Sequence, residues 1–160
     1  MDCYYGEFIH ALDAQCRVSL PSEWRRGDAG TEMILAPTAD RALVLLPPAL
    51  LDDFFARMRN ASVTNSGIQR ALVQFGRLCK KCRCDRQGRI ALDRERLDAI
   101  GVGKELVLSG AVTHIRLSAP GADSPVGEKN IAGALAALDE VNRSLGLDRA
   151  LKDALNGDRK

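Results

Sequence analysis

The residues of this chain best suited to chemistry lie between Arg77 and Arg96. This window holds eight basic and three acidic residues and therefore carries a charge of +5, whereas the whole chain of 160 residues has a net charge of only +2. Positive charge concentrated on one segment is typical of a surface that binds a polyanion such as nucleic acid. The alternative is that these lysines and arginines protect the exposed edge of a sheet from pairing. Charge alone leaves both explanations open.

At the centre of the window lies a well-formed turn, Asp85-Arg86-Gln87-Gly88-Arg89. An aspartate at the first position of a turn accepts hydrogen bonds from backbone amides two residues further on. A glycine at the fourth position can adopt a positive φ because it has no Cβ. The sequence therefore predicts a tight turn that is structured by Asp85 and Gly88.

This turn is repeated upstream, where residues 13–20 share Asp, Gln, Arg, an aliphatic residue and Leu with residues 85–92. The offset is 72 positions, and the same offset superimposes residues 34–36 on 106–108 and Pro48 on Pro120. No insertion or deletion is needed. We therefore predict two copies of one module, at residues 5–50 and 77–122.

Each copy has the pattern of a small β module. Apolar residues alternate on both sides of each turn, which predicts a β-hairpin in each copy. A short helical turn follows, at 22–26 with Ser22 as its cap and at 94–100 in the second copy. Two further strands are predicted in each copy, at 31–36 and 41–46 and at 104–109 and 113–118. Cys16 replaces the turn glycine in the first copy, and the sequence leaves open whether it is strained or adopts another turn.

The rest of the chain is predicted to be helical. Residues 51–76 form a linker with two helices, the first with Leu51, Phe54, Phe55 and Met58 on one face. Residues 123–160 form an extension in which Ile131, Leu135, Leu138 and Val141 mark an amphipathic helix, followed by a break at Gly146 and a polar tail. Trp24 and the Phe54-Phe55 pair are predicted to be core residues rather than platforms on which bases stack.

The doubled turn carries a resemblance to a known family. Residues 6–8 and 12–21, the turn at 85–90 and the Ser-Gly-Ala sequence at 109–111 resemble the MraZ family, which is built from two tandem AbrB-like (SpoVT-AbrB) modules. The resemblance covers about residues 4 to 120. The chain departs from the family at Cys16, where glycine is favoured, at Asp93, where proline is favoured, and in the length of its tail.

The resemblance implies a fold and a function. The fold is α+β and β-dominated, with two interlocked swapped-hairpin modules forming a pseudo-symmetric unit. Proteins of this family are ring-forming oligomers that bind DNA repeats upstream of the division and cell-wall gene cluster, usually as repressors that include their own promoter among their targets. The implied partners are therefore promoter DNA and further copies of the same chain, in the cytoplasm and associated with the nucleoid.

The resemblance also assigns roles to residues. Asp13 and Asp85 structure their turns and pair with Arg17 and Arg89, which point toward DNA. An arginine suits this role because its planar fork can bind two phosphate oxygens or the O6 and N7 of guanine. The phosphate contacts that position the protein without specifying a sequence are assigned to four flanking residues: Lys80, Lys81, Arg83 and Arg86.

The thiols of Cys79, Cys82 and Cys84 allow two interpretations. Their spacing partly fits a metal site, and nearby cations would lower their pKa values. However, no fourth ligand lies nearby in the sequence, and Cys82 and Cys84 are expected to share one face of a strand as buried apolar residues. We therefore predict structural thiols and no metal, while metal binding or redox sensing remains the alternative.

Several classes of function have no support in the sequence. His10 and His114 are the only histidines, and neither belongs to a recognisable catalytic arrangement, so we expect no enzyme, no cofactor and no small-molecule substrate. No transmembrane run or secretory signal is apparent, which makes the cytoplasm the expected compartment. The alternative to DNA binding is a protein-assembly module that keeps the fold and docks through its C-terminal helix.

Overall fold

A computed structural model describes residues 3–26, 30–59, 64–122 and 131–144. The chain divides into two units, Met1–Ala122 and Asp123–Lys160. The first unit contains all of the described strands, which form two antiparallel sheets, and the described helices are few. The predicted α+β, β-dominated class is therefore confirmed.

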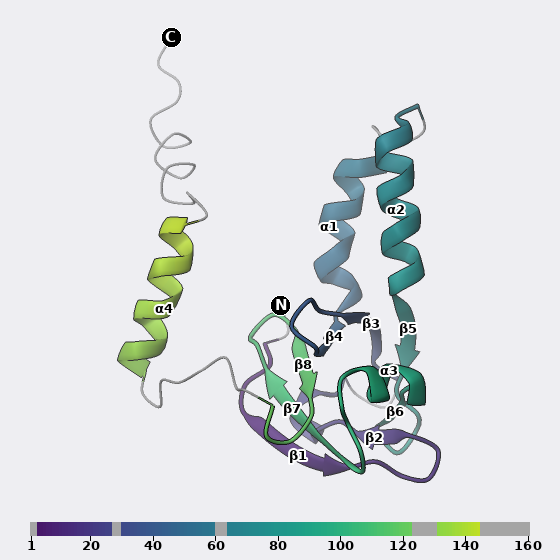
Figure 1. The fold of residues 1–160 in the computed structure, drawn as a ribbon, viewed down its shortest axis with the longest axis vertical. Coiled ribbons are helices and arrows are strands. Elements are labelled where there is room, and N and C mark those ends of the chain that lie inside the picture. Colours follow the sequence, from purple (N-terminus) through teal and green to yellow (C-terminus); the bar gives the residue numbers. More distant parts are fainter. Residues whose placement is uncertain (1–2, 27–29, 60–63, 123–130, 145–160) are drawn as a thin grey trace. The chain divides into compact units, whose positions relative to one another are not determined.

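The strands form two sheets, and Figure 1 labels each of them. The larger sheet has six strands and the smaller has two. In order across the larger sheet, the strands are β1 (Glu7–Ala11), β7 (Glu105–Gly110), β8 (Ile115–Ser118), β4 (Leu43–Leu46), β3 (Glu32–Pro37) and β5 (Lys80–Arg83). The smaller sheet is a ribbon of β2 (Arg17–Ser19) and β6 (Arg89–Ala91).

The strand order has an approximate two-fold arrangement. Exchanging each strand of residues 5–50 with its counterpart in 77–122 turns the order β1-β7-β8-β4-β3-β5 into its own reverse. Strands from the two halves of the sequence are therefore interleaved: β1 pairs with β7, β5 pairs with β3, and β2 pairs with β6.

The predicted local hairpins are wrong, because the strands on either side of each turn join different sheets. β1 lies in the six-stranded sheet and β2 lies in the ribbon, and β5 and β6 are divided in the same way. The physical reason is the burial of Val18 and Ile90, which lie opposite each other across the ribbon and are 0% exposed. Each apolar side chain is buried by the other half of the sequence, which a local hairpin would not achieve.

The prediction of a constant offset without insertions is also wrong. Leu35 and Leu108, both fully buried, occupy corresponding places in β3 and β7 and lie 73 positions apart rather than 72. The second copy has one residue more than the first in the connection between β6 and β7, where a full helical turn replaces a shorter one. It has one residue fewer in the connection between β7 and β8, so β4 and β8 again lie 72 positions apart.

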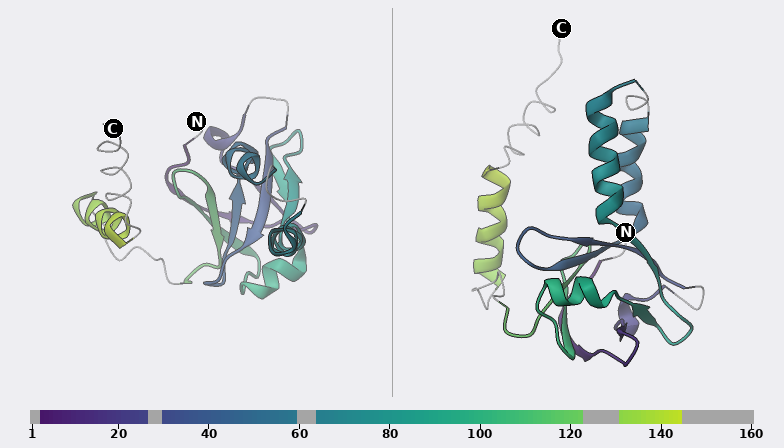
Figure 2. Two further views of the ribbon diagram at one scale, coloured as in Figure 1. Left: turned by 90° about the horizontal axis from the view of Figure 1, so that it is seen from above. Right: turned by 45° about the vertical axis from the view of Figure 1, so that its right-hand side comes forward.

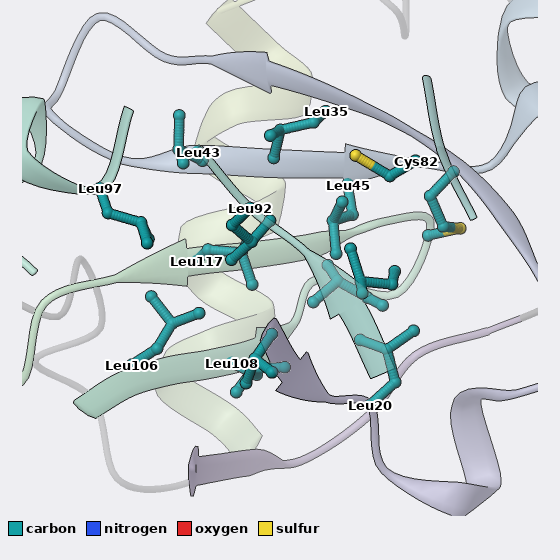
Figure 3. Packing of buried hydrophobic residues seen from close by; sticks show 14 of the residues in the cluster. Leu20, Leu35, Leu43, Leu45, Cys82, Leu92, Leu97, Leu106, Leu108 and Leu117 are labelled. Carbon is teal, nitrogen blue, oxygen red and sulfur yellow. The ribbon is translucent and has the colours of Figure 1, made fainter. Parts of the chain in front are cut away.

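The core of the first unit lies between the two sheets, and leucine is its most frequent residue (Figure 3). Leu20 and Leu92, which follow β2 and β6, pack into the same cluster as Leu35, Leu45 and Leu117 of the large sheet, so the core joins the two sheets.

Aromatic residues extend the core of the first unit. Trp24 is buried in edge-to-face contact with Tyr4 and Phe8, at ring-centroid distances of 6.0 and 5.1 Å. Its indole Nε1 donates to the carbonyl oxygen of Tyr5 at 3.1 Å. The prediction that Trp24 is a core residue is confirmed.

The short helices follow the ribbon strands. The first is a 3-10 turn, η1 (Ser22–Trp24), and the second is α3 (Arg94–Ala99). Pro21 rather than Ser22 precedes η1 as its N-cap residue, and no side chain caps the turn, so the predicted role of Ser22 is wrong. The fixed φ of proline suits the start of a helical turn without a capping hydrogen bond.

The linker forms two helices that lie side by side, α1 (Pro48–Arg59) and α2 (Ser66–Leu78) (Figure 2). Pro48 begins α1, where the missing N–H of a proline costs nothing. Asn65 caps α2 by accepting from the amides of Gly67 and Ile68 at 3.0 and 3.1 Å. The helices meet through the rings of Phe55 and Phe75, whose centroids lie 5.4 Å apart.

Parts of the helical predictions fall outside the described residues, namely the side chains of Phe54 and Met58, the break at Gly146 and the polar tail. In the second unit, the predicted helix is α4 (Ile131–Ser144). None of the helices in the described ranges combines the length and the apolar run needed to cross a bilayer.

Candidate nucleic-acid interface

The first turn, residues 13–17, is organised by Asp13. One carboxylate oxygen, Oδ1, accepts from the backbone amides of Gln15 and Arg17, both at 2.9 Å. The other, Oδ2, accepts from Nε of Arg17 at 2.7 Å. These bonds, above all the one from the backbone amide of Arg17, hold the pKa of Asp13 below its usual value.

The second turn, residues 85–89, repeats this pattern. Oδ1 of Asp85 accepts from the amides of Gln87 and Arg89, both at 2.9 Å, and Oδ2 accepts from Nε and Nη2 of Arg89, both at 2.8 Å. The pKa of Asp85 is lowered by the same bonds, the backbone amide of Arg89 first. Each arginine is thus held side-on by an aspartate four residues earlier.

Cys16 adopts the same backbone conformation as the glycine that it replaces. Its φ is +57°, and φ of Gly88 is +76°. The amides of both residues donate to the carbonyl oxygen of the turn aspartate, at 3.0 Å for Cys16 and 2.9 Å for Gly88. The first turn therefore keeps the geometry of the second, and Cys16 bears the strain of a left-handed conformation, about 1 kcal/mol.

The β2–β6 ribbon brings the two arginines to one face. Arg17 lies opposite Ala91 and Arg89 lies opposite Ser19, with the buried pair Val18 and Ile90 between them. Because successive strand residues point to opposite faces, Arg17 and Arg89 both lie on the face that is turned away from the core. Their side chains are 31% and 26% exposed.

The two turns are also in electrostatic contact. Nη1 of Arg89 lies 3.8 Å from Oδ2 of Asp13, the same oxygen that Arg17 contacts. Two carboxylates and two guanidinium groups therefore form one cluster at the outer face of the ribbon. The aspartates fix the orientation of the arginines, and the remaining N–H groups of each guanidinium can donate to a ligand.

Two of the flanking basic residues have acidic partners. Lys80 forms an ion pair with Asp93, and Lys81 lies 3.1 Å from Glu32. The partner of Lys80 is shared with Arg96, whose Nε is 3.2 Å from Asp93. Much of the positive charge of the 77–96 window is therefore neutralised by acidic side chains in direct contact with it.

The other two flanking residues are exposed. The side chain of Arg83 passes close to Gly30, since a Cβ built on Gly30 would lie 2.7 Å from Nε of Arg83. Arg86 extends from the tip of the second turn and has no ion pair with any residue in the described ranges. Among the flanking residues, Arg86 therefore has the most direct access to a ligand.

Sequence reasoning missed Arg25, which packs against the second turn. A Cβ built on Gly88 would lie 2.1 Å from Nη1 of Arg25, so the guanidinium covers this glycine. Arg25 follows Trp24 directly and belongs to the other half of the sequence from the turn that it covers. The only signal in the sequence was the glycine itself, whose missing side chain allows a close approach.

The cysteines have the environment of core residues. Cys82 and Cys84 are 5% and 7% exposed within the hydrophobic cluster, and Cys79 is half-buried. Burial raises the pKa values of all three, that of Cys84 to about 11, so the expectation of lowered pKa values in a metal site is wrong. No group of three potential metal-binding side chains gathers within the described part of the chain.

The histidines have structural partners. Nδ1 of His10 lies 2.6 Å from the carbonyl oxygen of Ser19, and so connects β1 to the end of β2. His114 is half-buried next to Thr113, and burial lowers its pKa.

Comparison with known proteins identifies relatives of the chain, although no family model matches it. A protein named transcriptional regulator MraZ from Symbiobacterium thermophilum is 29% identical over 112 residues, which cover 70% of this chain and 80% of the relative. Its namesake from Pelodictyon phaeoclathratiforme is 28% identical over 120 residues, covering 69% and 79%. That from Acetivibrio thermocellus is 26% identical over 114 residues, covering 71% and 79%. These matches confirm the resemblance indicated by the two turns.

Proposed function

We propose that this chain, a relative of the MraZ transcriptional regulators, is a DNA-binding transcriptional regulator that reads a specific sequence. It acts as a repressor of the division and cell-wall gene cluster, including its own promoter, and it is associated with the nucleoid. The relatives are named regulators of transcription rather than enzymes.

The observation that carries this proposal is the placement of Arg17 and Arg89 on the outer face of a two-stranded ribbon. A two-stranded ribbon is one of the elements that the major groove of DNA admits. The aspartates hold both guanidinium groups in fixed orientations, which reduces the entropy lost when the arginines bind. Base contacts would then come from these two arginines, and phosphate contacts from Arg83, Arg86, Lys80 and Lys81.

The binding unit is an oligomer of the chain on tandem DNA repeats. One ribbon presents two arginines, which is a small contact by the standards of specific DNA recognition. Linking several such units in one assembly raises the total affinity without new contacts, provided that the repeats match the spacing of the ribbons. The oligomer should therefore bind DNA with tandem repeats much more tightly than DNA with a single repeat.

The test is binding to a labelled duplex that carries the repeats upstream of the gene encoding the chain, over a range of salt concentrations. A scrambled duplex of equal length serves as the reference. We expect tighter binding to the repeats, with log K falling linearly as log salt rises, by about 0.9 for each phosphate contacted. Equal affinity for both duplexes would rule out sequence-specific recognition.

The arginine assignment is tested with Arg89→Ala, which should lower affinity for the repeats at least about tenfold. Thermal stability and oligomer size should change little, because Arg89 is not a core residue. Arg70→Ala, at an exposed position of α2, controls for the loss of one positive charge. If Arg89→Ala binds as tightly as the unaltered chain, the assignment of this residue is wrong.

A second candidate function, protein assembly, is favoured by α4. Four apolar side chains of this helix, Ile131, Leu135, Leu138 and Val141, are between 52% and 74% exposed in the second unit. Their spacing places them along one side of the helix. A chain ending at residue 130 distinguishes the two functions: if it loses oligomer size but still binds the repeats as a smaller species, α4 serves assembly and the ribbon serves DNA binding.

A further inference from the structure

A pocket of about 210 Å³ lies beside the second turn. It is formed by both halves of the sequence, with the η1 region and the two residues before β3 on one side and the second turn on the other. Its lining residues are Ser22, Arg25, Gly30, Thr31, Cys84, Asp85, Arg86 and Gly88.

Arg25 gives this pocket a positive charge that the described residues do not balance. The guanidinium lies against the backbone of Gly88, with 2.1 Å from Nη1 and 2.5 Å from Cζ to a Cβ built there. Its Nε is buried and has no hydrogen-bond partner within the described ranges, which also contain no ion pair to Arg25. A buried donor without an acceptor is unfavourable, and an anion in the pocket would offset this cost by accepting from the Nη groups of the same guanidinium.

Arg86 adds a second positive charge, and the acidic residue of the pocket is already engaged. Asp85 accepts from two backbone amides and from Nε and Nη2 of Arg89. Cys84 contributes a neutral thiol at physiological pH, since burial raises its pKa to about 11. The pocket therefore has an excess of donors, and the Ser22 hydroxyl is a further one.

The first turn lacks this arrangement. Ala14 occupies the position of Arg86, and at offsets of 72 and 73 the position of Arg25 falls on Leu97 and Asp98. An arginine does approach Cys16, since Nη1 of Arg94 lies 4.0 Å from its Sγ. However, Arg94 is engaged by Asp98 and by the carbonyl oxygens of Val102 and Gly103. Its guanidinium has no need of an external acceptor.

We propose that the pocket beside the second turn binds a phosphate group, with Arg25 and Arg86 donating to its oxygens. Two planar guanidinium groups that line one pocket suit a tetrahedral oxyanion. The identity of the phosphate rests on the proposed function: if the chain binds DNA, the phosphate belongs to the DNA backbone beside the groove that Arg89 enters. A free phosphate ion offers the same chemistry and is the other source.

The DNA arm of the test compares the full-length chain with Arg25→Gln and Arg25→Lys. Arg25→Gln should lower affinity for the repeat duplex about five- to tenfold and reduce the slope of log K against log salt by about 0.9, the loss of one phosphate contact. Arg25→Lys keeps the charge and should retain the slope. Arg70→Gln on α2 removes an equal charge elsewhere and should change neither quantity.

The phosphate arm uses inorganic phosphate alone and therefore does not require DNA binding. Phosphate should shift the backbone amide resonances of Gly30, Thr31 and Gly88 in the unaltered chain and not in Arg25→Gln. A melting curve for each variant establishes that it is folded, and Arg25→Lys provides a second folded variant should Arg25→Gln be unstable.

The outcomes separate the pocket from the proposed function. Loss of affinity and slope in the DNA arm supports a backbone phosphate as the ligand. Phosphate-dependent shifts without any effect on DNA binding support the pocket with a free anion as its ligand, and they do so even if the chain binds no DNA. If Arg25→Gln alters neither arm, the phosphate pocket is overturned.

Discussion

The turn at 13–17 and the turn at 85–89 have the same backbone and the same aspartate-to-arginine bonds, but they differ in what surrounds them. At the first, the fourth residue is Cys16, held at a φ of +57°. At the second, it is Gly88, and the space of its missing side chain is taken by the guanidinium of Arg25. The first turn also has Ala14 at its tip, whereas the second has Arg86.

This difference shows that the glycine of the second turn has two physical roles. A residue other than glycine can adopt the turn conformation at a cost of about 1 kcal/mol, as Cys16 shows. The missing side chain of Gly88 also lets the guanidinium of Arg25 lie directly against the backbone of the turn, whereas Arg94 reaches only the thiol of Cys16 at the first turn. The symmetric strand arrangement therefore supports two turns with unequal surroundings, of which the second is more positively charged.

The largest expected difference is in DNA binding by Arg89→Ala and Arg17→Ala. We expect Arg89→Ala to lower affinity for the repeats by up to about 3 kcal/mol, and Arg17→Ala by about 1 kcal/mol, the two ends of the range for an arginine that contacts a base. The reason is that Arg89 acts beside Arg86 and Arg25, whereas at the first turn the tip residue is Ala14 and the guanidinium of Arg94 is engaged by Asp98 and by two backbone carbonyl oxygens. Equal losses, measured by titration at one salt concentration, would show that the two turns contribute alike.

Gly88→Ala should destabilise the fold by about 2 kcal/mol, because alanine is strained at a φ of +76° and its Cβ would clash with Arg25. The matched control is Cys16→Ala, which should cost less than about 1 kcal/mol because Cys16 already bears the backbone strain. Both free energies of unfolding follow from urea titrations. Equal costs would mean that Arg25 moves aside without loss.

A smaller effect is expected from giving the first turn a tip arginine with Ala14→Arg. Ala14 is exposed, so the substitution should leave the melting temperature unchanged. If the two ribbon ends face DNA alike, affinity for the repeats should rise about threefold and the salt slope should steepen by about 0.9. An unchanged slope would indicate that the first turn does not approach a phosphate.

The smallest difference between the two turns is expected when the pH is lowered, because acid should affect both turns equally. The pKa values of Asp13 and Asp85 are both lowered by backbone amide donors, so each carboxylate stabilises the fold above its unfolded pKa of about 3.8 and loses this effect as the pH falls through its folded pKa. NMR titration of the carboxyl carbons should give two midpoints below 3.8. A midpoint at or above 3.8 for one of them would reveal a difference between the turns that the geometry does not contain.

Much of the fold could be predicted from local patterns in the sequence. Alternation around residues 13–20 and 85–92 located the ribbon strands, and the apolar pattern of residues 51–76 predicted the two linker helices, although α1 begins earlier, at Pro48. Strand pairing could not be predicted in this way, because alternation identifies the buried face of a strand and not its partner. The burial of Val18 by Ile90 is a contact between residues 72 positions apart.

The candidate site was only partly visible for the same reason. The aspartate and the arginine of each turn are four residues apart, so their contact follows from the sequence. The partners of Lys80 and Lys81 are Asp93 and Glu32, and the glycine covered by Arg25 is Gly88. These distant contacts decide which basic groups remain available, and a count of charges in the 77–96 window does not contain them.

The interleaved sheet also constrains how the protein is made. β1 pairs with β7, so that Glu7 and Ser109 are partners across 102 positions of sequence. When the first half of the chain leaves the ribosome, β3 and β4 are the only described strands of that half able to pair with each other. The native sheet therefore forms only after β8 has been synthesised, and folding is completed after translation of the second copy, at the slow rates typical of distant strand pairing.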